Sequence, residues 1–135
     1  MSIITYVTYI FNYFCIVLYL QWVLEMARMK SFFKTEMLFL KIVEEKDCYG
    51  YEITHSIKER TNGEIDIKEE SMYPILYRLE ELGYISSKKE LVGKRMTRIY
   101  YHLEPTGKEH LHKIYFEFQK MVNIINELMG EEKNE

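Results

Sequence analysis

The chain has 135 residues, of which 47% are hydrophobic and 29% charged, and its formal net charge at pH 7 is −3. This composition indicates one compact domain with an appendage, and it excludes disordered, fibrous and collagen-like chains. Two cysteines, Cys15 and Cys48, are too few for a disulfide framework and are not spaced as zinc ligands. Because the whole chain is acidic, it can bind nucleic acid only through a local basic patch.

The charges are unevenly distributed, and one short segment is strongly basic. Residues 1–24 carry no charge at all. The basic residues of the short segment, opposed only by Glu90, are Lys88, Lys89, Lys94, Arg95 and Arg98. This segment has a local charge of 5 − 1 = +4 and is suited to contact with a polyanion.

Residues 1–25 form a hydrophobic leader. Met1–Leu24 is apolar on every face of a helix, and as a helix it would be about 36 Å long, enough to cross a hydrocarbon core of about 30 Å. The positive residues that follow, Arg28, Lys30 and Lys34, would keep the next domain in the cytoplasm. The leader is therefore a candidate transmembrane segment.

Two other interpretations of the leader stay open. Translation could start at Met26 or Met29, in which case the upstream residues are a start-site artefact. Alternatively, the leader could be an apolar helix that is buried in an oligomer. A membrane is thus a partner only if residues 1–24 are a genuine part of the protein.

Residues 30–104 predict a small domain that begins with three helices. Apolar spacing places these helices at Phe32–Glu45, Tyr51–Thr61 and Lys68–Leu82. The residues expected on the buried face of the third helix are Met72, Ile75, Leu76, Leu79 and Leu82. Gly83 then supplies a helix stop.

A β-hairpin is predicted next. Its strands are expected at Tyr84–Lys88 and Arg98–Leu103, and the intervening Lys89–Thr97 is too polar to be core. Three helices followed by a two-stranded ribbon with a basic tip describe a winged helix-turn-helix. The expected fold class is therefore α+β, mainly α.

Residues 105–130 predict a long C-terminal helix, followed by a short tail at residues 131–135. Thr106 and Glu109 have the spacing of a capping box. Apolar residues step by four and three in a heptad seam that is expected to dimerise: Leu111, Tyr115, Phe118, Val122, Ile125 and Met129. A second stripe could pack on the chain's own domain: Ile114, Met121, Ile124 and Leu128. The alternative is that the seam itself packs on that domain.

Several short motifs in this order resemble the PadR family of bacterial transcriptional regulators, over about Lys30 to Leu111. The motifs are Tyr49-Gly50-Tyr51-Glu52-Ile53, Ser71-Met72-Tyr73-Pro74-Ile75-Leu76-Tyr77-Arg78-Leu79-Glu80, Gly83-Tyr84-Ile85, Arg98-Ile99-Tyr100-Tyr101 and Thr106-Gly107. The resemblance implies a homodimer with a single C-terminal dimerisation helix, which binds a pseudo-palindromic operator in double-stranded DNA. It also implies that the third helix enters the major groove, that the wing follows the backbone or minor groove, and that a small-molecule effector regulates binding.

The candidate DNA contacts lie on the third helix and on the hairpin. On a helical wheel Tyr73, Pro74 and Tyr77 point away from the apolar stripe, and tyrosines there suit phosphates, sugars and thymine methyl groups. The predicted DNA-binding residues are Ser71, Tyr73, Pro74, Tyr77, Arg78, Lys88, Lys94, Arg95, Thr97 and Arg98. The alternatives are that the tyrosines pack beneath the wing and that the basic segment is simply a solvated loop.

The sequence offers little for catalysis. His110 and His112 would point to different sides of a helix, so they are expected to be surface residues rather than metal ligands. Cys48 is expected to be a small buried hydrophobe rather than a redox switch. We therefore predict no enzymatic activity, no catalytic residues, no metal site and no cofactor.

Two functions of different classes follow. The first is a cytoplasmic, sequence-specific DNA-binding regulator, a dimeric repressor that a small-molecule effector releases. The alternative is a membrane-anchored winged-helix module that binds other proteins and has little affinity for DNA. The second reading is motivated by the uncharged leader and by Glu69 and Glu70, which would repel phosphate at the start of the third helix.

Overall fold

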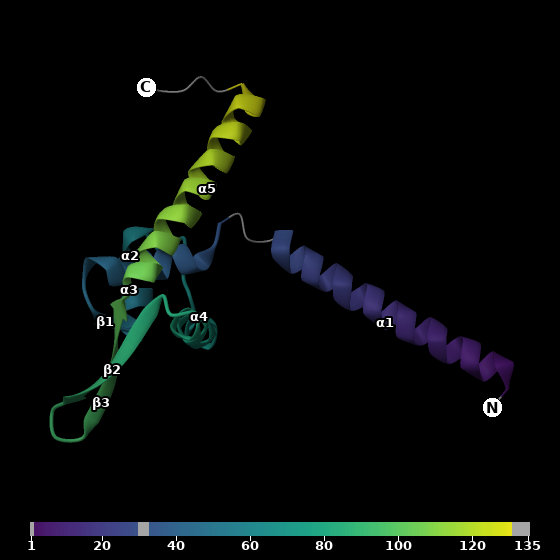
Figure 1. Cartoon of the computed structure of the whole chain (residues 1–135), viewed down its shortest axis with the longest axis horizontal. Helices are drawn as coiled ribbons and strands as arrows, with labels where there is room; N and C mark the ends of the chain where they lie inside the picture. Colours follow the sequence, from purple (N-terminus) through teal and green to yellow (C-terminus); the bar gives the residue numbers. More distant parts are fainter. Residues whose placement is uncertain (1, 30–32, 131–135) are drawn as a thin grey trace. The chain divides into compact units, whose positions relative to one another are not determined.

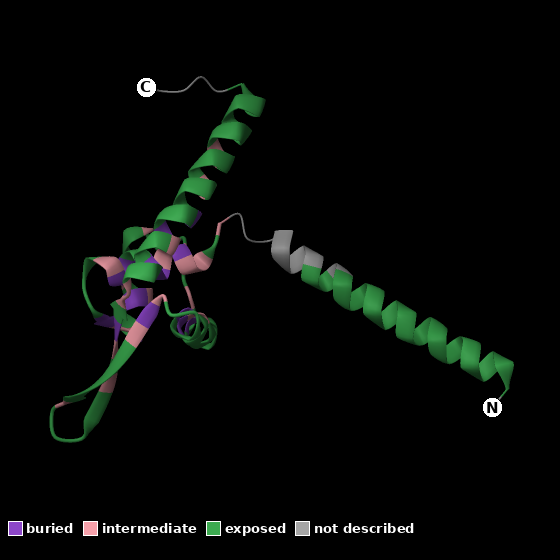
Figure 2. Ribbon diagram, in the orientation of Figure 1, coloured by how far each residue is buried: buried purple, intermediate pink, exposed green. Residues whose placement is uncertain are grey.

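The computed structural model describes residues 2–29 and 33–130, and the chain divides into two units, Met1–Phe32 and Phe33–Glu135. The first unit is a single helix, α1 (Ile3–Met29). Within it Ile3–Gln21 is long and apolar enough to cross a membrane, and none of that stretch is buried against other residues (Figure 2). Lys30 and the tail predicted at residues 131–135 lie outside the described residues.

The second unit contains four helices and a small sheet in its described residues (Figure 1). The helices are α2 (Thr35–Glu45), α3 (Gly50–Arg60), α4 (Glu69–Glu81) and α5 (Pro105–Met129). The strands are β1 (Cys48–Tyr49), β2 (Ile85–Val92) and β3 (Met96–Leu103), in the antiparallel order β1-β3-β2. The predicted fold class, mainly helical with a winged helix-turn-helix, is confirmed.

The helices form where the apolar spacing predicts them, with ends that differ by up to three residues. Met72, Leu76 and Leu79 of α4 are buried together with residues from α2, α3 and α5 in one core. Leu82, which we expected on the same face, is 50% exposed. It lies ten residues from Met72, which at 100° per residue places it about 80° away from that side chain.

The hairpin is longer than predicted. Its ladder runs from the pair Ile85 and Leu103 to the pair Val92 and Met96, so the polar segment that we expected to be a loop is mostly strand. Burial is not required here, because cross-strand backbone hydrogen bonds pair a polar ribbon as well as an apolar one. The turn is left to three residues, and Gly93 adopts a φ of 71° there.

Strand β1 was not predicted. Cys48 pairs with Tyr101 and Tyr49 pairs with Tyr100, so β3 is the central strand of the sheet. Cys48 is fully buried, as expected, and burial raises the pKa of its thiol to about 11. A thiol with so high a pKa is protonated at neutral pH and behaves as a small apolar side chain.

The start of α5 differs from the predicted capping box. The helix begins at Pro105, and the hydroxyl of Thr106 donates to the carbonyl oxygen of Gly83 at 2.7 Å instead of capping the helix. Proline suits a first helical position, because its missing N–H would have no partner there. Thr106 therefore ties α5 to the loop that precedes β2.

Candidate nucleic-acid interface

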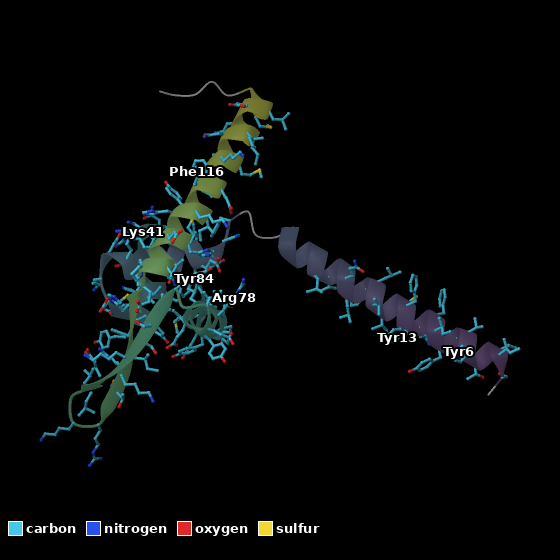
Figure 3. All side chains as sticks on the ribbon, viewed as in Figure 1. Tyr6, Tyr13, Lys41, Arg78, Tyr84 and Phe116 are labelled. Carbon is cyan, nitrogen blue, oxygen red and sulfur yellow. The ribbon has the colours of Figure 1, made fainter. Side chains whose placement is uncertain are left out.

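Helix α4 presents two tyrosines to solvent. Tyr73 is 53% exposed and Tyr77 is 69% exposed, whereas Met72, Leu76 and Leu79 on the opposite side are buried. The prediction that these tyrosines face outward is confirmed, and the alternative that they pack beneath the wing is wrong. The other predicted contacts on this helix, Ser71, Pro74 and Arg78, are also exposed, and the stick view places Arg78 on the α4 surface (Figure 3).

The tip of the hairpin carries unpaired positive charge. Lys94, Arg95 and Thr97 are exposed, and neither cation forms an ion pair with any described residue. Lys88 lies further down β2, where its ammonium is 3.6 Å from the carboxylate of Glu90. The hairpin projects from the helical body on the side away from α5, so its tip is free to meet a large partner (Figure 1).

Arg98 differs from the other cations of the hairpin. Its guanidinium lies over the ring of Tyr49, 4.4 Å from the ring centroid, and the residue is partly buried. This geometry is that of a cation–π contact. Arg98, predicted as a phosphate contact, is thus engaged within the protein.

A surface hollow of about 570 Å³ is lined by residues of α3, α4 and the hairpin strand β3. Tyr73 of α4 and Thr97 of β3 both line it, so the outward face of α4 and the wing border one continuous surface. Sequence reasoning missed the contribution of α3 to this surface: Tyr51 and His55 line the hollow, with their rings stacked 5.5 Å apart. Their four-residue spacing, offset from the buried Ile53 and Ile57, was the signal that could have found them.

The two lysines that flank the hollow share one carboxylate, which compensates one of their two charges. Asp66 accepts from Lys68 at 2.7 Å and from Lys58 at 3.2 Å. These hydrogen bonds, of which the one from Lys68 has the larger effect, hold the pKa of Asp66 below its usual range. The tip of the wing, where Lys94 and Arg95 form no ion pair with a described residue, therefore carries more uncompensated positive charge than this side of α3.

Helix α5 carries an apolar face that extends past the domain core. Leu111, predicted in the dimer seam, is 5% exposed and packs in the chain's own core with Ile114, and Phe118 is partly buried against that core. Further along, the seam residues Tyr115, Ile125 and Met129 are exposed, and Val122 is partly exposed. The second stripe also leaves the domain after Ile114, since Met121, Ile124 and Leu128 are all exposed (Figure 2).

The apolar residues of α5 are buried in its N-terminal half and exposed in its C-terminal half for a geometric reason. Helix α5 crosses α2 only with its N-terminal half, and the remainder extends beyond the domain (Figure 1). An apolar hollow of about 500 Å³, lined by Met37, Leu38 and Tyr115 among others, lies between the two helices. Both stripes of the C-terminal half are therefore uncovered in a single copy of the chain.

His110 has a structural position rather than the expected surface one. Its Nε2 lies 2.9 Å from a carboxylate oxygen of Glu36, and its ring stacks on Tyr84 with the centroids 4.2 Å apart. His112 is exposed, 3.9 Å from Glu44. In the part of the chain that the structure describes, no three His, Cys, Asp or Glu side chains lie close enough together to hold a metal ion.

The fold is that of a winged-helix protein. Helices α2, α3 and α4 pack beside a three-stranded sheet, and α4 has one exposed face. Residues 39–113 match the Transcriptional regulator PadR-like family, and the chain belongs to this family. The family consists of transcriptional regulators, and the comparisons do not support the membrane-anchored alternative.

Solved structures show the same similarity. A transcriptional regulator from Clostridium thermocellum is 32% identical, with a TM-score of 0.65 over 69% of this chain and 90% of that one. A PadR family transcription regulator from Clostridium difficile is 33% identical, with a TM-score of 0.59 over 70% of this chain and 96% of that one. Bacillus subtilis PadR, solved in complex with operator DNA, is 27% identical, with a TM-score of 0.55 over 58% of this chain and 44% of that one.

Proposed function

We propose that this protein is a cytoplasmic, homodimeric repressor that binds a pseudo-palindromic operator in double-stranded DNA and is released by a small-molecule effector. The observation that carries the proposal is that Tyr73 and Tyr77 are exposed on α4, while Lys94 and Arg95 at the hairpin tip form no ion pair with any acidic side chain that the structure describes. The operator complex of the Bacillus subtilis relative supports DNA as the partner.

The two parts of this surface suit different parts of a duplex. A helix fits the major groove, where tyrosine hydroxyls can bond base edges or phosphates and rings can contact thymine methyl groups. Tyr77 and Arg78 are exposed on α4, and we propose that they read sequence in this way. Lys94 and Arg95 are exposed at the tip of the wing, and their proposed role is to neutralise phosphates, which supplies affinity without sequence information.

A second copy of this chain is the proposed partner of α5. The uncovered apolar residues of its C-terminal half include Ile125 and Leu128, the latter 84% exposed. Such a contiguous apolar face is typical of a protein interface, and its four-three spacing is that of paired helices. Two copies joined in this way would present two wings and two α4 helices to half-sites spaced by about one turn of DNA, roughly 34–36 Å.

DNA binding can be tested by fluorescence anisotropy with a duplex from the region upstream of the gene and with a scrambled duplex. We expect Tyr77→Ala to reduce the preference for the upstream duplex and to leave the salt dependence unchanged. Lys94→Gln should instead flatten the plot of log K against log salt by about 1.8 for a dimer, at about 0.9 per lost phosphate contact. Lys113→Gln, at an exposed cation on α5, is the control and should change neither.

The outcomes separate the parts of the proposal. Equal binding of both duplexes by the wild type would remove sequence specificity, and an absence of binding at low salt would remove the DNA-binding function. If Tyr77→Ala leaves the preference for the upstream duplex unchanged, the proposal that Tyr77 of α4 recognises the sequence is wrong.

Dimerisation can be tested by sedimentation velocity of Ile125→Glu. Ile125 lies on the uncovered half of α5, so a charge there should produce monomers without disturbing the core. Phe118→Glu is a poorer test, because Phe118 also packs against the chain's own core. A dimer that resists Ile125→Glu would mean that another surface joins the copies.

The effector is proposed to occupy the apolar hollow between α2 and α5, where it would alter the angle of α5 and thus the spacing of the wings. Compounds that raise the melting temperature of the protein should weaken its binding to the upstream duplex, and Leu38→Ala, which changes the lining of the hollow without placing a charge against the core, should reduce both effects. Ligands that stabilise the protein and leave DNA affinity unchanged would refute this mode of release.

A further inference from the structure

The cations of the wing are not equivalent. The ribbon contains Lys88, Lys89, Lys94, Arg95 and Arg98, and only Arg98 is partly buried while the other four are exposed. In the β-ladder Arg98 lies directly opposite Glu90, yet the carboxylate of Glu90 pairs with Lys88 at 3.6 Å. The guanidinium of Arg98 lies on Tyr49 instead.

Tyr49 is placed where three elements meet. It is the second residue of β1 and pairs with Tyr100 of β3, whose ring meets it edge to face with the centroids 5.7 Å apart. Tyr49 is also the residue that precedes α3, and its backbone N–H donates to the carboxylate of Glu52 in the first turn of that helix at 3.2 Å. A group bound to the Tyr49 ring is therefore bound to the start of α3.

A row of flat groups continues from this ring along α3. The rings of Tyr49 and Tyr51 are stacked with their centroids 6.4 Å apart, and Tyr51 stacks in turn on His55. Arg98 caps one end of this row from the wing. Guanidinium groups stack well on aromatic faces because they are planar and weakly hydrated.

We propose that Arg98 is a positioning residue, which clamps the wing to α3 through Tyr49 and thereby sets the distance between the wing tip and α4, rather than neutralising a phosphate. Strand β1 contributes only two residues to the ladder, so the Arg98–Tyr49 contact extends the attachment of β3 to this side of the domain beyond the backbone pairs. Close contact of both α4 and the wing with one duplex requires that the two be held at a set spacing. The inference rests on the proposed DNA binding.

Salt dependence distinguishes the two roles in the full-length protein. Each cation that neutralises a phosphate adds about 0.9 to the slope of log K against log salt, so Arg95→Gln should flatten the slope by about 1.8 in a dimer. Arg98→Gln should lower the affinity for the upstream duplex by about tenfold and leave the slope unchanged. Tyr49→Leu should reproduce the effect of Arg98→Gln, while Tyr49→Phe, which keeps the ring, should bind as the wild type does.

Two further measurements complete the test. In the double variant Tyr49→Leu/Arg98→Gln the losses should not add, because either change alone removes the clamp. In the free protein, amides of β1 and of the facing part of β3 should exchange faster in Arg98→Gln than in Arg95→Gln.

The inference is overturned if Arg98→Gln flattens the slope as Arg95→Gln does, if Arg98→Gln leaves both affinity and amide exchange unchanged, or if the losses of Tyr49→Leu and Arg98→Gln add fully. Failure of the wild type to bind either duplex is a different result, since it removes the proposed function itself.

Discussion

Gly107 lies where α5 approaches the start of the wing too closely for any side chain. A Cβ atom at this position would overlap the carbonyl oxygen of Tyr84, and it would come within 2.8 Å of both the Tyr84 carbonyl carbon and a methyl group of Leu103. The Tyr84 carbonyl cannot turn away without loss, because it accepts the backbone N–H of Glu104 at 3.0 Å. The change Gly107→Ala must therefore displace either the first turn of α5 or the first residues of β2.

The magnitude follows from two opposing effects. Alanine in place of glycine inside a helix is worth about 0.5–1 kcal/mol in favour of folding. Overpacking costs about 1–3 kcal/mol, and a clash with backbone lies at the upper end of this range. We expect Gly107→Ala to lower the free energy of unfolding by about 2 kcal/mol, which for a domain of this size lowers the melting temperature by roughly 8–16 °C.

Gly50→Ala is the matched control for this prediction. Gly50 is also buried in the first turn of a helix, but the Cβ atom there would meet the flexible end of Met72, whose Cε lies at 2.9 Å. This side chain can move, so Gly50→Ala should stay within about 1 kcal/mol of the wild type. Urea denaturation of the two variants measures the difference, and equal stabilities would refute the reasoning from close approach.

Three other predictions follow from the core, the sheet and the division into units. Leu79→Ala, at a side chain that is 1% exposed, should cost about 2–5 kcal/mol in urea denaturation, while Leu82→Ala, at the exposed C-cap residue of that helix, should cost little. The hydrogen bond of His102 with Asp47 raises the pKa of that imidazole. The stability that the pair contributes is thus complete below the unfolded pKa of about 6.5 and is lost as the pH rises through the higher folded value, so Asp47→Asn should destabilise the protein at about pH 6 and have no effect at about pH 9. Deletion of residues 1–32 should leave the urea midpoint and DNA affinity unchanged, because every core residue that the structure describes lies in the second unit; a lower midpoint would contradict this expectation.

Local spacing predicted the helices and the outward face of α4, because both depend on which residues recur every three or four positions. Tyr73 and Tyr77 could be assigned to solvent from the positions of Met72, Leu76 and Leu79 alone. The same rule failed for Leu82, at the edge of the stripe. Periodicity indicates which side of a helix is apolar, but it does not indicate how much of that side the rest of the domain covers.

Features that depend on contacts far apart in the sequence could not be predicted in this way. Strand β1 exists only because Cys48 and Tyr49 meet β3, and the clamp of Arg98 on Tyr49 follows from that register. The heptad seam of α5 is real as a pattern, yet Leu111 belongs to the core, because α2 covers only the first turns of the helix. Which residues of one stripe are covered is decided by where the neighbouring helix ends.

The base of the wing and the start of α5 are joined by contacts among a few residues. The carbonyl of Gly83 accepts the hydroxyl of Thr106, the carbonyl of Tyr84 accepts the backbone N–H of Glu104, and the Tyr84 ring, at the base of the hairpin in Figure 3, stacks on His110. The direction of α5 is therefore fixed relative to the direction of the hairpin within one copy of the chain. If α5 joins two copies, a change in the angle between the two α5 helices must rotate both wings by a comparable amount, because this junction has no flexible linker to absorb it. A ligand that acts only on the α5 contact could then weaken DNA binding without touching a single DNA-contacting residue, and Gly107→Ala, which perturbs the junction, should weaken DNA binding beyond what its loss of stability explains.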